Sequence, residues 1–104
     1  GGDMASLIVV YWRDIPAQVI AKKSRREQVK IVLDERFEKA IDRAAMRGKA
    51  RDTDSYLAEW RKSEPEECGD DIQQQAQAKA QELEAAFDTQ RLNAFVANAG
   101  RTPA

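Results

Sequence analysis

The residues that could do chemistry are few in this chain, and histidine is missing altogether. The 104 residues include 17 Lys and Arg, 18 Asp and Glu, one Cys and no His. A Ser-His-Asp triad, a Cys-His pair and a His-ligated metal site all need the missing residue. The one thiol, Cys68, cannot form an internal disulfide or a thiolate metal cluster. We therefore expect no catalytic residue, no metal ligand and no cofactor.

Carboxylates remain as candidates for acid–base chemistry, and they gather in residues 64–71. A catalytic carboxyl pair needs an apolar pocket that raises the pKa of one partner, and this stretch offers none. Asp52 and Asp54 lack the glycine and the terminal glutamate of a calcium loop at the required offsets. Cys68 lies among the acids, which disfavour a thiolate. We therefore predict that the protein is not an enzyme.

Basic residues are concentrated in the first half of the chain. Residues 1–51 carry 12 Lys and Arg against 7 acids, a net of +5, whereas residues 52–104 carry 5 against 11, a net of −6. One basic group spans residues 22–30. A second lies on one flank of a predicted helix and comprises Arg36, Lys39, Arg43 and Arg47. The simpler interpretation is a solvated face with i,i+4 pairs.

The basic half is nevertheless a candidate surface for an acidic protein partner. A phosphate site would need a glycine-rich loop or a free helix N-terminus, and the predicted helix begins with Asp34 and Glu35, which repel anions. The isoelectric point of about 5.5 also argues against nucleic acid, which favours a basic domain. The opposite charges of the two halves permit head-to-tail association, so a homodimer is a further alternative.

Aromatic residues suggest a second contact surface, since four of the seven fall in two predicted strands: Tyr11, Trp12, Tyr56 and Trp60. Alternation along a strand sends Tyr11 and Trp12 to opposite faces of the sheet, so one of them should face away from the helices. We expect that outward aromatic, together with Arg13 and Ile15 at the following turn, to contact a partner.

The elements of the first half follow from hydrophobic periodicity. The β-branched and aromatic run over residues 7–12 predicts a strand, and the turn at residues 13–16 joins it to a second extended run over residues 17–23. A short third strand is predicted over residues 29–33. The apolar stripe between Asp34, a good N-cap, and Gly48 predicts an amphipathic helix.

The span from Ser55 to Ser63 is ambiguous. Its aromatics alternate as on a strand, yet they would also share a helix face after a cap at Asp54; we favour the strand. An acidic linker over residues 64–69 then leads to a long helix that ends near Ala99.

Two apolar stripes on this last helix cannot face one surface. The first ends at Phe87, and the second comprises Leu92, Phe95 and Val96. Either the helix bends near residues 88–89, where Thr89 could cap a second segment that wraps around the same core, or the second stripe contacts a partner or a second copy. We favour the bend.

These elements predict an α+β domain over residues 4–99, in the order β-β-(β)-α-β-α. A small antiparallel sheet of three to four strands would carry two helices packed on one face. Residues 1–3 are expected to be a cloning remnant before Met4, and residues 100–104 a disordered tail. The longest apolar run, residues 7–12, is far short of the roughly 18 residues of a membrane span, and no signal-peptide pattern precedes it. We therefore expect a cytoplasmic protein without a membrane segment.

Three segments resemble a small bacterial family that carries the label "virulence factor": YWRDIPAQV within residues 10–19, RFEKAIDRAAMR at residues 36–47, and YLAEWR at residues 56–61. The resemblance covers most of residues 4–100. It implies an accessory protein without an established catalytic mechanism, and a helper role in corrinoid-dependent methyl transfer or methionine synthesis. Without His, the chain could not itself supply the lower cobalt ligand of a cobalamin carrier.

The sequence therefore predicts a non-enzymatic interaction protein that docks on a larger cytoplasmic protein. The predicted contact residues are Tyr11, Trp12, Arg13, Ile15, Arg36, Lys39, Arg43 and Arg47, with Leu92, Phe95 and Val96 as a second contact. The alternative is an anion- or nucleic-acid-binding domain that uses the basic N-terminal half.

Overall fold

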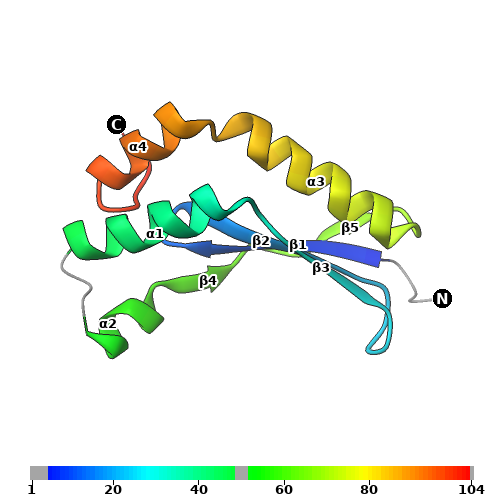
Figure 1. The fold of residues 1–104 in the computed structure, drawn as a ribbon. Helices are drawn as coiled ribbons and strands as arrows, with labels where there is room; N and C mark the ends of the chain where they lie inside the picture. The colour runs from blue at the N-terminus through cyan, green and yellow to red at the C-terminus, as the bar shows by residue number, and fades with distance from the viewer. Residues whose placement is uncertain (1–4, 49–51, 104) are drawn as a thin grey trace.

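A central antiparallel sheet begins the chain and carries the helices that follow it (Figure 1). The computed structural model describes residues 5–48 and 52–103. The expected cloning remnant at residues 1–3 lies outside the described residues. In order, the elements are β1 (Ala5–Trp12), β2 (Ile15–Lys22), β3 (Gln28–Val32), α1 (Glu35–Arg47), α2 (Thr53–Ala58), β4 (Trp60–Lys62), β5 (Glu66–Cys68), α3 (Ile72–Ala86) and α4 (Thr89–Ala97). The predicted α+β class is confirmed.

The sheet has the strand order β3-β2-β1-β4, and β5 also pairs with β1. The β4 and β5 segments share one edge of β1, with Lys62 opposite Val10 and Glu66 opposite Leu7. Pro65 separates the two segments, as expected for a residue that cannot donate to a ladder. Part of the predicted acidic linker is therefore an edge strand, because its backbone completes the pairing of β1.

The span from Ser55 to Ser63 combines both structures between which we chose. Residues 53–58 form α2, capped by Asp52, whose carboxylate accepts from the Ser55 amide at 2.8 Å. The strand begins only at Trp60. The prediction of a strand was therefore wrong for residues 55–58, where the cap at Asp52 starts a helical turn.

The last helix is broken where two apolar stripes meet. α3 ends at Ala86, and Asp88 caps α4 by accepting from the Arg91 amide at 2.8 Å; Thr89, the expected cap, is the first residue of α4. Leu92, Phe95 and Val96 are buried in the core of the same chain. The bend is therefore confirmed, and these three residues offer no exposed surface for a second contact.

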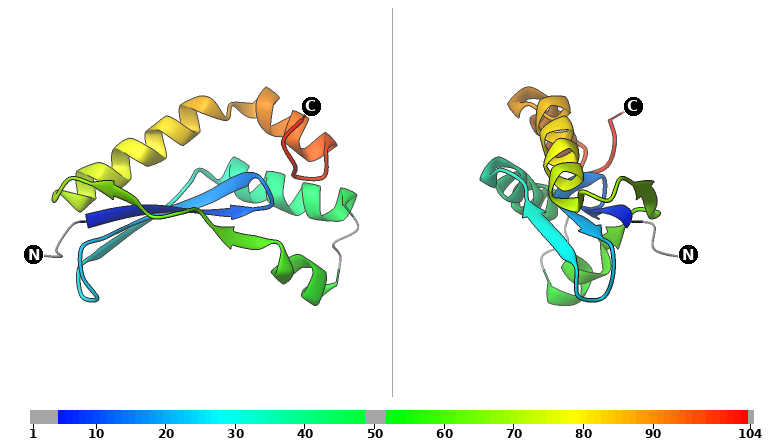
Figure 2. Two further views of the ribbon diagram at one scale, coloured as in Figure 1. Left: turned by 180° about the vertical axis from the view of Figure 1, so that it is seen from behind. Right: turned by 90° about the vertical axis from the view of Figure 1, so that its right-hand side faces the viewer.

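The helices lie mainly on one side of the sheet. α3 packs on the face formed by Leu7, Val9, Val19 and Ala21, through Ala76, Ala80 and Leu83. α1 packs against α4 and β2, and α2 lies on the other side, near the turn between β1 and β2 (Figures 1 and 2). The elements α2 and α4 thus enclose the end of the sheet where that turn lies.

The C-terminal residues fold back onto the same turn. Gly100 is buried against the Trp12 ring with a φ of 90°. Asp14 donates its amide to the Gly100 carbonyl at 2.9 Å and accepts from the Thr102 amide at 2.7 Å. The prediction of a disordered tail over residues 100–104 was wrong for residues 100–103, since their backbone groups hold the β1–β2 turn.

Candidate functional site

The β1–β2 turn, which the sequence predicts as a contact surface, is covered by other segments of the same chain. Arg13, with a φ of 52°, donates to the Ala99 carbonyl at 2.8 Å and to the Glu59 carboxylate at 3.3 Å. Its side chain is only 11% exposed. Arg13 therefore ties the turn to the start of β4 and to the C-terminal segment, and offers little to a partner.

The aromatic and aliphatic residues beside this turn are also internal. Trp12 and Ile15 are both 0% exposed. The Trp12 ring stacks on Tyr56 with centroids 5.8 Å apart, and its Nε1 donates to the Tyr56 carbonyl at 2.9 Å. Tyr11 is half-buried beneath Arg61, whose Cζ lies 4.5 Å above the ring centroid. The predicted contact by Trp12 and Ile15 is wrong, because the sheet end that carries them is covered on both sides.

The basic flank of α1 exists as predicted, but it faces α3 and α4. Arg36 donates to the carbonyls of Glu84 and Phe87 at 2.7 and 3.2 Å. Arg43 binds the Asn93 side chain, and Arg47 donates to a carbonyl at the end of α4. The fourth residue, Lys39, is exposed and forms an i,i+4 pair with Glu35. Three of the four predicted contact residues therefore bridge α1 to α3 or α4, although Arg43 and Arg47, like Lys39, remain exposed.

The Asp14 side chain accepts several hydrogen bonds at this end of the sheet. Besides the Thr102 amide, it accepts from the Thr102 hydroxyl at 3.0 Å and from Arg61 at 3.1 Å. Burial raises the pKa of the Asp14 carboxyl, but these hydrogen bonds and the Arg61 charge outweigh burial, so its pKa lies below the ordinary value. The carboxylate therefore fastens the C-terminal segment to the β1–β2 turn.

Cys68 and the acidic stretch lie close together near the paired edge of β1. Burial, Asp70 and Glu66 all raise the pKa of the Cys68 thiol, so a thiolate is disfavoured. Across residues 5–48 and 52–103, no three carboxylate or thiol groups converge on a point where a metal ion could sit. None of the helices described has the length and apolar character needed to cross a bilayer.

The sheet face opposite α3 has no helix against its hairpin half in the described structure (Figure 2). The strand register sets the residues of this face side by side in three rows. They are Val10, Gln18, Val32 and Lys62; Ile8, Ile20 and Lys30; and Ser6, Lys22, Gln28 and Glu67. We refer to these eleven residues as the open sheet face.

Aliphatic side chains form the centre of the open sheet face, and lysines form its rim. Val32 is 66% exposed, the largest value among the exposed large hydrophobic residues, and Ile8 and Ile20 are half-buried. Lys22, Lys30 and Lys62 are exposed, and none of them forms an ion pair with another described residue. An apolar centre with unneutralised positive charge around it is typical of a docking surface.

The two basic groups of the first half do not form one surface. The β2–β3 hairpin that carries residues 22–30 lies at the end of the sheet away from the β1–β2 turn (Figure 1). The arginines of α1 point instead to α3 and α4. A continuous basic surface, which a nucleic acid would need, is therefore not assembled by these residues.

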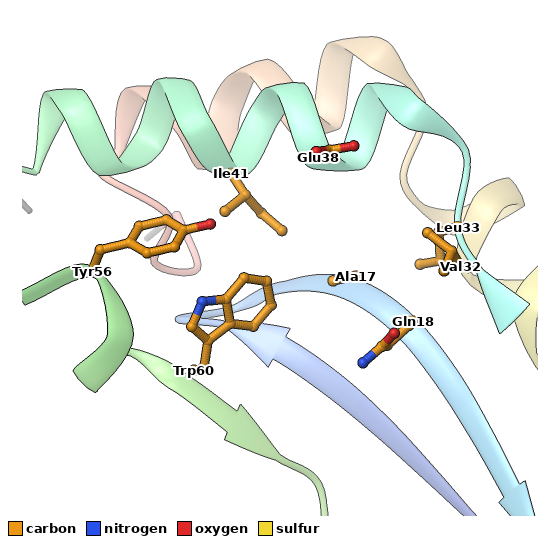
Figure 3. Close-up of a pocket in the computed structure, with 8 residues that line it drawn as sticks. All are labelled: Ala17, Gln18, Val32, Leu33, Glu38, Ile41, Tyr56 and Trp60. Atoms are coloured by element: carbon orange, nitrogen blue, oxygen red, sulfur yellow. The ribbon is translucent and has the colours of Figure 1, made fainter. Parts of the chain in front are cut away.

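A pocket of about 270 Å³ opens where the open sheet face meets α1 and α2 (Figure 3). Its lining consists of Ala17, Gln18, Val32, Leu33, Glu38, Ile41, Tyr56 and Trp60. The rings of Tyr56 and Trp60 stand at 84° to each other with centroids 5.9 Å apart. Glu38 lies above them on α1, and Gln18 lies across from them on β2.

The electrostatics of this pocket are set by carboxylates. Glu38 is the one charged residue among those that line it. Burial raises the pKa of the Tyr56 hydroxyl, and the nearby charges of Asp42 and Glu38 raise it further. Neither acid forms an ion pair with another described residue. The pocket therefore combines aromatic walls, an aliphatic floor and negative charge.

The comparison with family models matches residues 10–96 to the model described as "Virulence factor". The chain belongs to the virulence factor family. The match spans all of the elements that build the open sheet face and the pocket, except residues 5–9 of β1, which include Ser6 and Ile8. Comparison with curated proteins and with solved structures gives no match.

Sequence reasoning missed the central residues of both surfaces in this family member. Ile8 and Ile20 fall within the strands predicted over residues 7–12 and 17–23, and Glu38 falls within the predicted helix, but none of the three was given a role at a contact surface. The i,i+2 spacing of Ile20 and Lys22 in the second strand was a usable signal, because it places an apolar and a charged side chain on the same face. No local sequence pattern predicts that Tyr56 and Glu38 line the same pocket, because this depends on how α2 folds back beneath α1.

Proposed function

We propose that this protein is a non-enzymatic interaction module that docks through its open sheet face on an acidic, partly apolar surface of a larger protein. The observation that supports this proposal is the combination on one face of exposed Val32, the isoleucines beside it and three lysines that form no ion pair with any residue in the described part of the chain. Proteins of corrinoid-dependent methyl transfer, which the family resemblance suggests, are the first partners to test.

The chemistry of this face limits what can cover it. An aliphatic centre gains free energy when it is removed from water, at about 25 cal/mol per Å² of apolar surface. Lys22, Lys30 and Lys62 would speed association with an acidic surface and repel a basic one. Glu67, in the third row, is the one negatively charged residue among the eleven of the open sheet face. An acidic surface with apolar residues at its centre therefore fits better than a basic or purely polar one.

The proposal can be tested by cross-linking in cells. A photoreactive phenylalanine analogue is placed at Val32 or Ile8 on the open sheet face, or at Met46, which is 61% exposed on α1, as the control. We expect the same protein to be captured from Val32 and Ile8 and not from Met46, through a peptide rich in Asp and Glu. Capture only of a second copy of this chain, capture that nuclease treatment abolishes, or equal capture from Met46 would overturn the proposal.

A purified pair then gives the quantitative test. Lys30→Glu reverses a charge on the open sheet face, whereas Lys39→Glu makes the same change on α1, outside that face. By isothermal titration calorimetry we expect Lys30→Glu to raise the Kd by about tenfold or more, and Lys39→Glu to leave it within about twofold. Equal effects of the two variants would mean that binding follows overall charge and not this face.

A further inference from the structure

We infer that the pocket between α1, α2 and the sheet binds an alkylammonium group. Tyr56 and Trp60 provide two aromatic walls at right angles, and Glu38 provides a carboxylate above them. This inference goes beyond the docking role, because it concerns a small-molecule site at the end of the open sheet face, with which the pocket shares only Gln18 and Val32.

The aromatic walls are held in place before any ligand binds. The ring of Tyr56 stacks on the buried ring of Trp12, and the backbone carbonyl of Tyr56 accepts from the Trp12 indole at 2.9 Å. Trp60 lies directly opposite Trp12 in the pairing of β1 with β4. Walls fixed in this way lose little conformational entropy on binding, which favours a weakly hydrated ligand that contacts ring faces.

The charge of the pocket selects a cation. Glu38 and Asp42 lie one turn apart on α1, and both act on the Tyr56 hydroxyl. An anion would be repelled by these carboxylates, and a neutral apolar ligand would leave their attraction unused. An ammonium group on an alkyl stem satisfies the acids and the π faces with its head, and Ile41 and Leu33 with its stem.

The size of the pocket limits the ligand to a small headgroup. A volume of about 270 Å³ is just below the range of roughly 300–1,000 Å³ typical of sites for drug-sized ligands. A trimethylammonium group or the end of a lysine side chain fits this description, whereas a nucleotide does not. Both groups share the same chemistry, so the choice between them is left to the two arms of the experiment.

The test uses the two tryptophans as site and internal control. Choline and n-butylammonium are titrated separately into the ¹⁵N-labelled protein, and the two indole N–H resonances are followed by NMR. We expect the Trp60 resonance to shift in a saturable manner, and the resonance of buried Trp12, whose N–H is already bonded, to move little. The Trp60 signal is assigned by its loss in Trp60→Leu. Stronger binding of choline indicates a quaternary ammonium ligand, and stronger binding of butylammonium indicates a lysine-like one.

Two controls make the inference refutable. 3,3-Dimethylbutan-1-ol has the shape of choline without its charge and should shift the Trp60 resonance little. Glu38→Gln should weaken binding by roughly fivefold, whereas Glu35→Gln, on the same helix but outside the pocket, should change it less than about twofold. Equal shifts with the neutral alcohol, no shift with either cation, or equal effects of the two variants would overturn the inference. None of these results depends on a protein partner, so they leave the docking proposal untouched.

Discussion

Replacing Gly100 by alanine tests the structure where it departs most from the sequence-based expectation. Gly100 follows α4 and has a φ of 90°, a region that residues with a Cβ rarely adopt. A Cβ at this position would lie 2.9 Å from Cζ3 and 3.2 Å from Cε3 of Trp12. The ring cannot easily move away, because Trp12 is 0% exposed and its indole N–H is bonded to Tyr56.

The size of the effect follows from two costs. Forcing a residue with a Cβ into a positive-φ conformation costs about 1–2 kcal/mol. Overpacking a rigid core ring costs about 1–3 kcal/mol. We therefore expect Gly100→Ala to lower the free energy of unfolding by about 2–5 kcal/mol, which for a domain of this size lowers Tm by at least about 8 °C.

The assay is thermal and urea unfolding followed by circular dichroism, with Gly69→Ala as the matched control. A Cβ at Gly69 would meet only the Gln75 amide, at 3.5 Å, and should change Tm by less than about 3 °C. A Gly100→Ala variant as stable as the wild type would refute the docking of residues 100–103 on the core, and would restore the expectation of a disordered tail.

Three further predictions follow from the contacts of this end of the molecule. Because the pKa of the Asp14 carboxyl is lowered in the folded state, its ionised form stabilises the fold above the ordinary pKa, and this stabilisation is lost as pH falls through the lowered value. Between about pH 6 and pH 3 the wild-type Tm should therefore fall further than the Tm of Asp14→Asn. Parallel curves of Tm against pH for the two proteins would contradict this. In urea unfolding, Arg36→Ala should lower the free energy of unfolding by about 1.5–3 kcal/mol, and Lys39→Ala by less than about 0.5 kcal/mol. Equal losses in the two variants would contradict the role of Arg36 in joining α1 to α3. Phe95→Ala should cost about 3–5 kcal/mol without changing the sedimentation coefficient, and a change of association at unchanged stability would restore the partner contact.

Much of the fold could be predicted because local pattern and final structure agree over its first half. The β1–β2 hairpin, the third strand and α1 follow directly from period and capping, and Asp34 caps α1 as expected by accepting from the Arg36 amide. The errors lie where the chain adjusts to its neighbours. α2 and β4 divide a span whose aromatics suit either state, and β5 forms within acidic residues only because β1 has an unpaired edge there.

Less of the candidate site could be predicted, for a reason visible in β1 and β2. A register shift between Val10 and Tyr11 changes which residues of the two strands share a face. Strict alternation made either Tyr11 or Trp12 an outward residue, yet near the shift both sides of the sheet are covered, by α1 and α2 and by the C-terminal segment. The face that does stay open lies on the far side of the shift, around Ile8 and Ile20. The strand register cannot be read from the sequence, so the sequence does not show where along β1 and β2 the open sheet face begins.

The basic first half misled for a second reason, which is that arginine and lysine take different roles in this fold. Arginine side chains donate to backbone carbonyls near helix ends: Arg36 to Glu84 and Phe87, Arg91 to Ala86, Arg47 to Ala97 and Arg13 to Ala99. The last carbonyls of a helix lack intrahelical partners and carry partial negative charge, and the planar guanidinium offers several donors to satisfy them. Lysine has no such fork and stays hydrated, so the lysines of the sheet retain their charge at the surface. Lys22, Lys30 and Lys62 therefore place positive charge that a partner can reach on the open sheet face, which also carries exposed Val32.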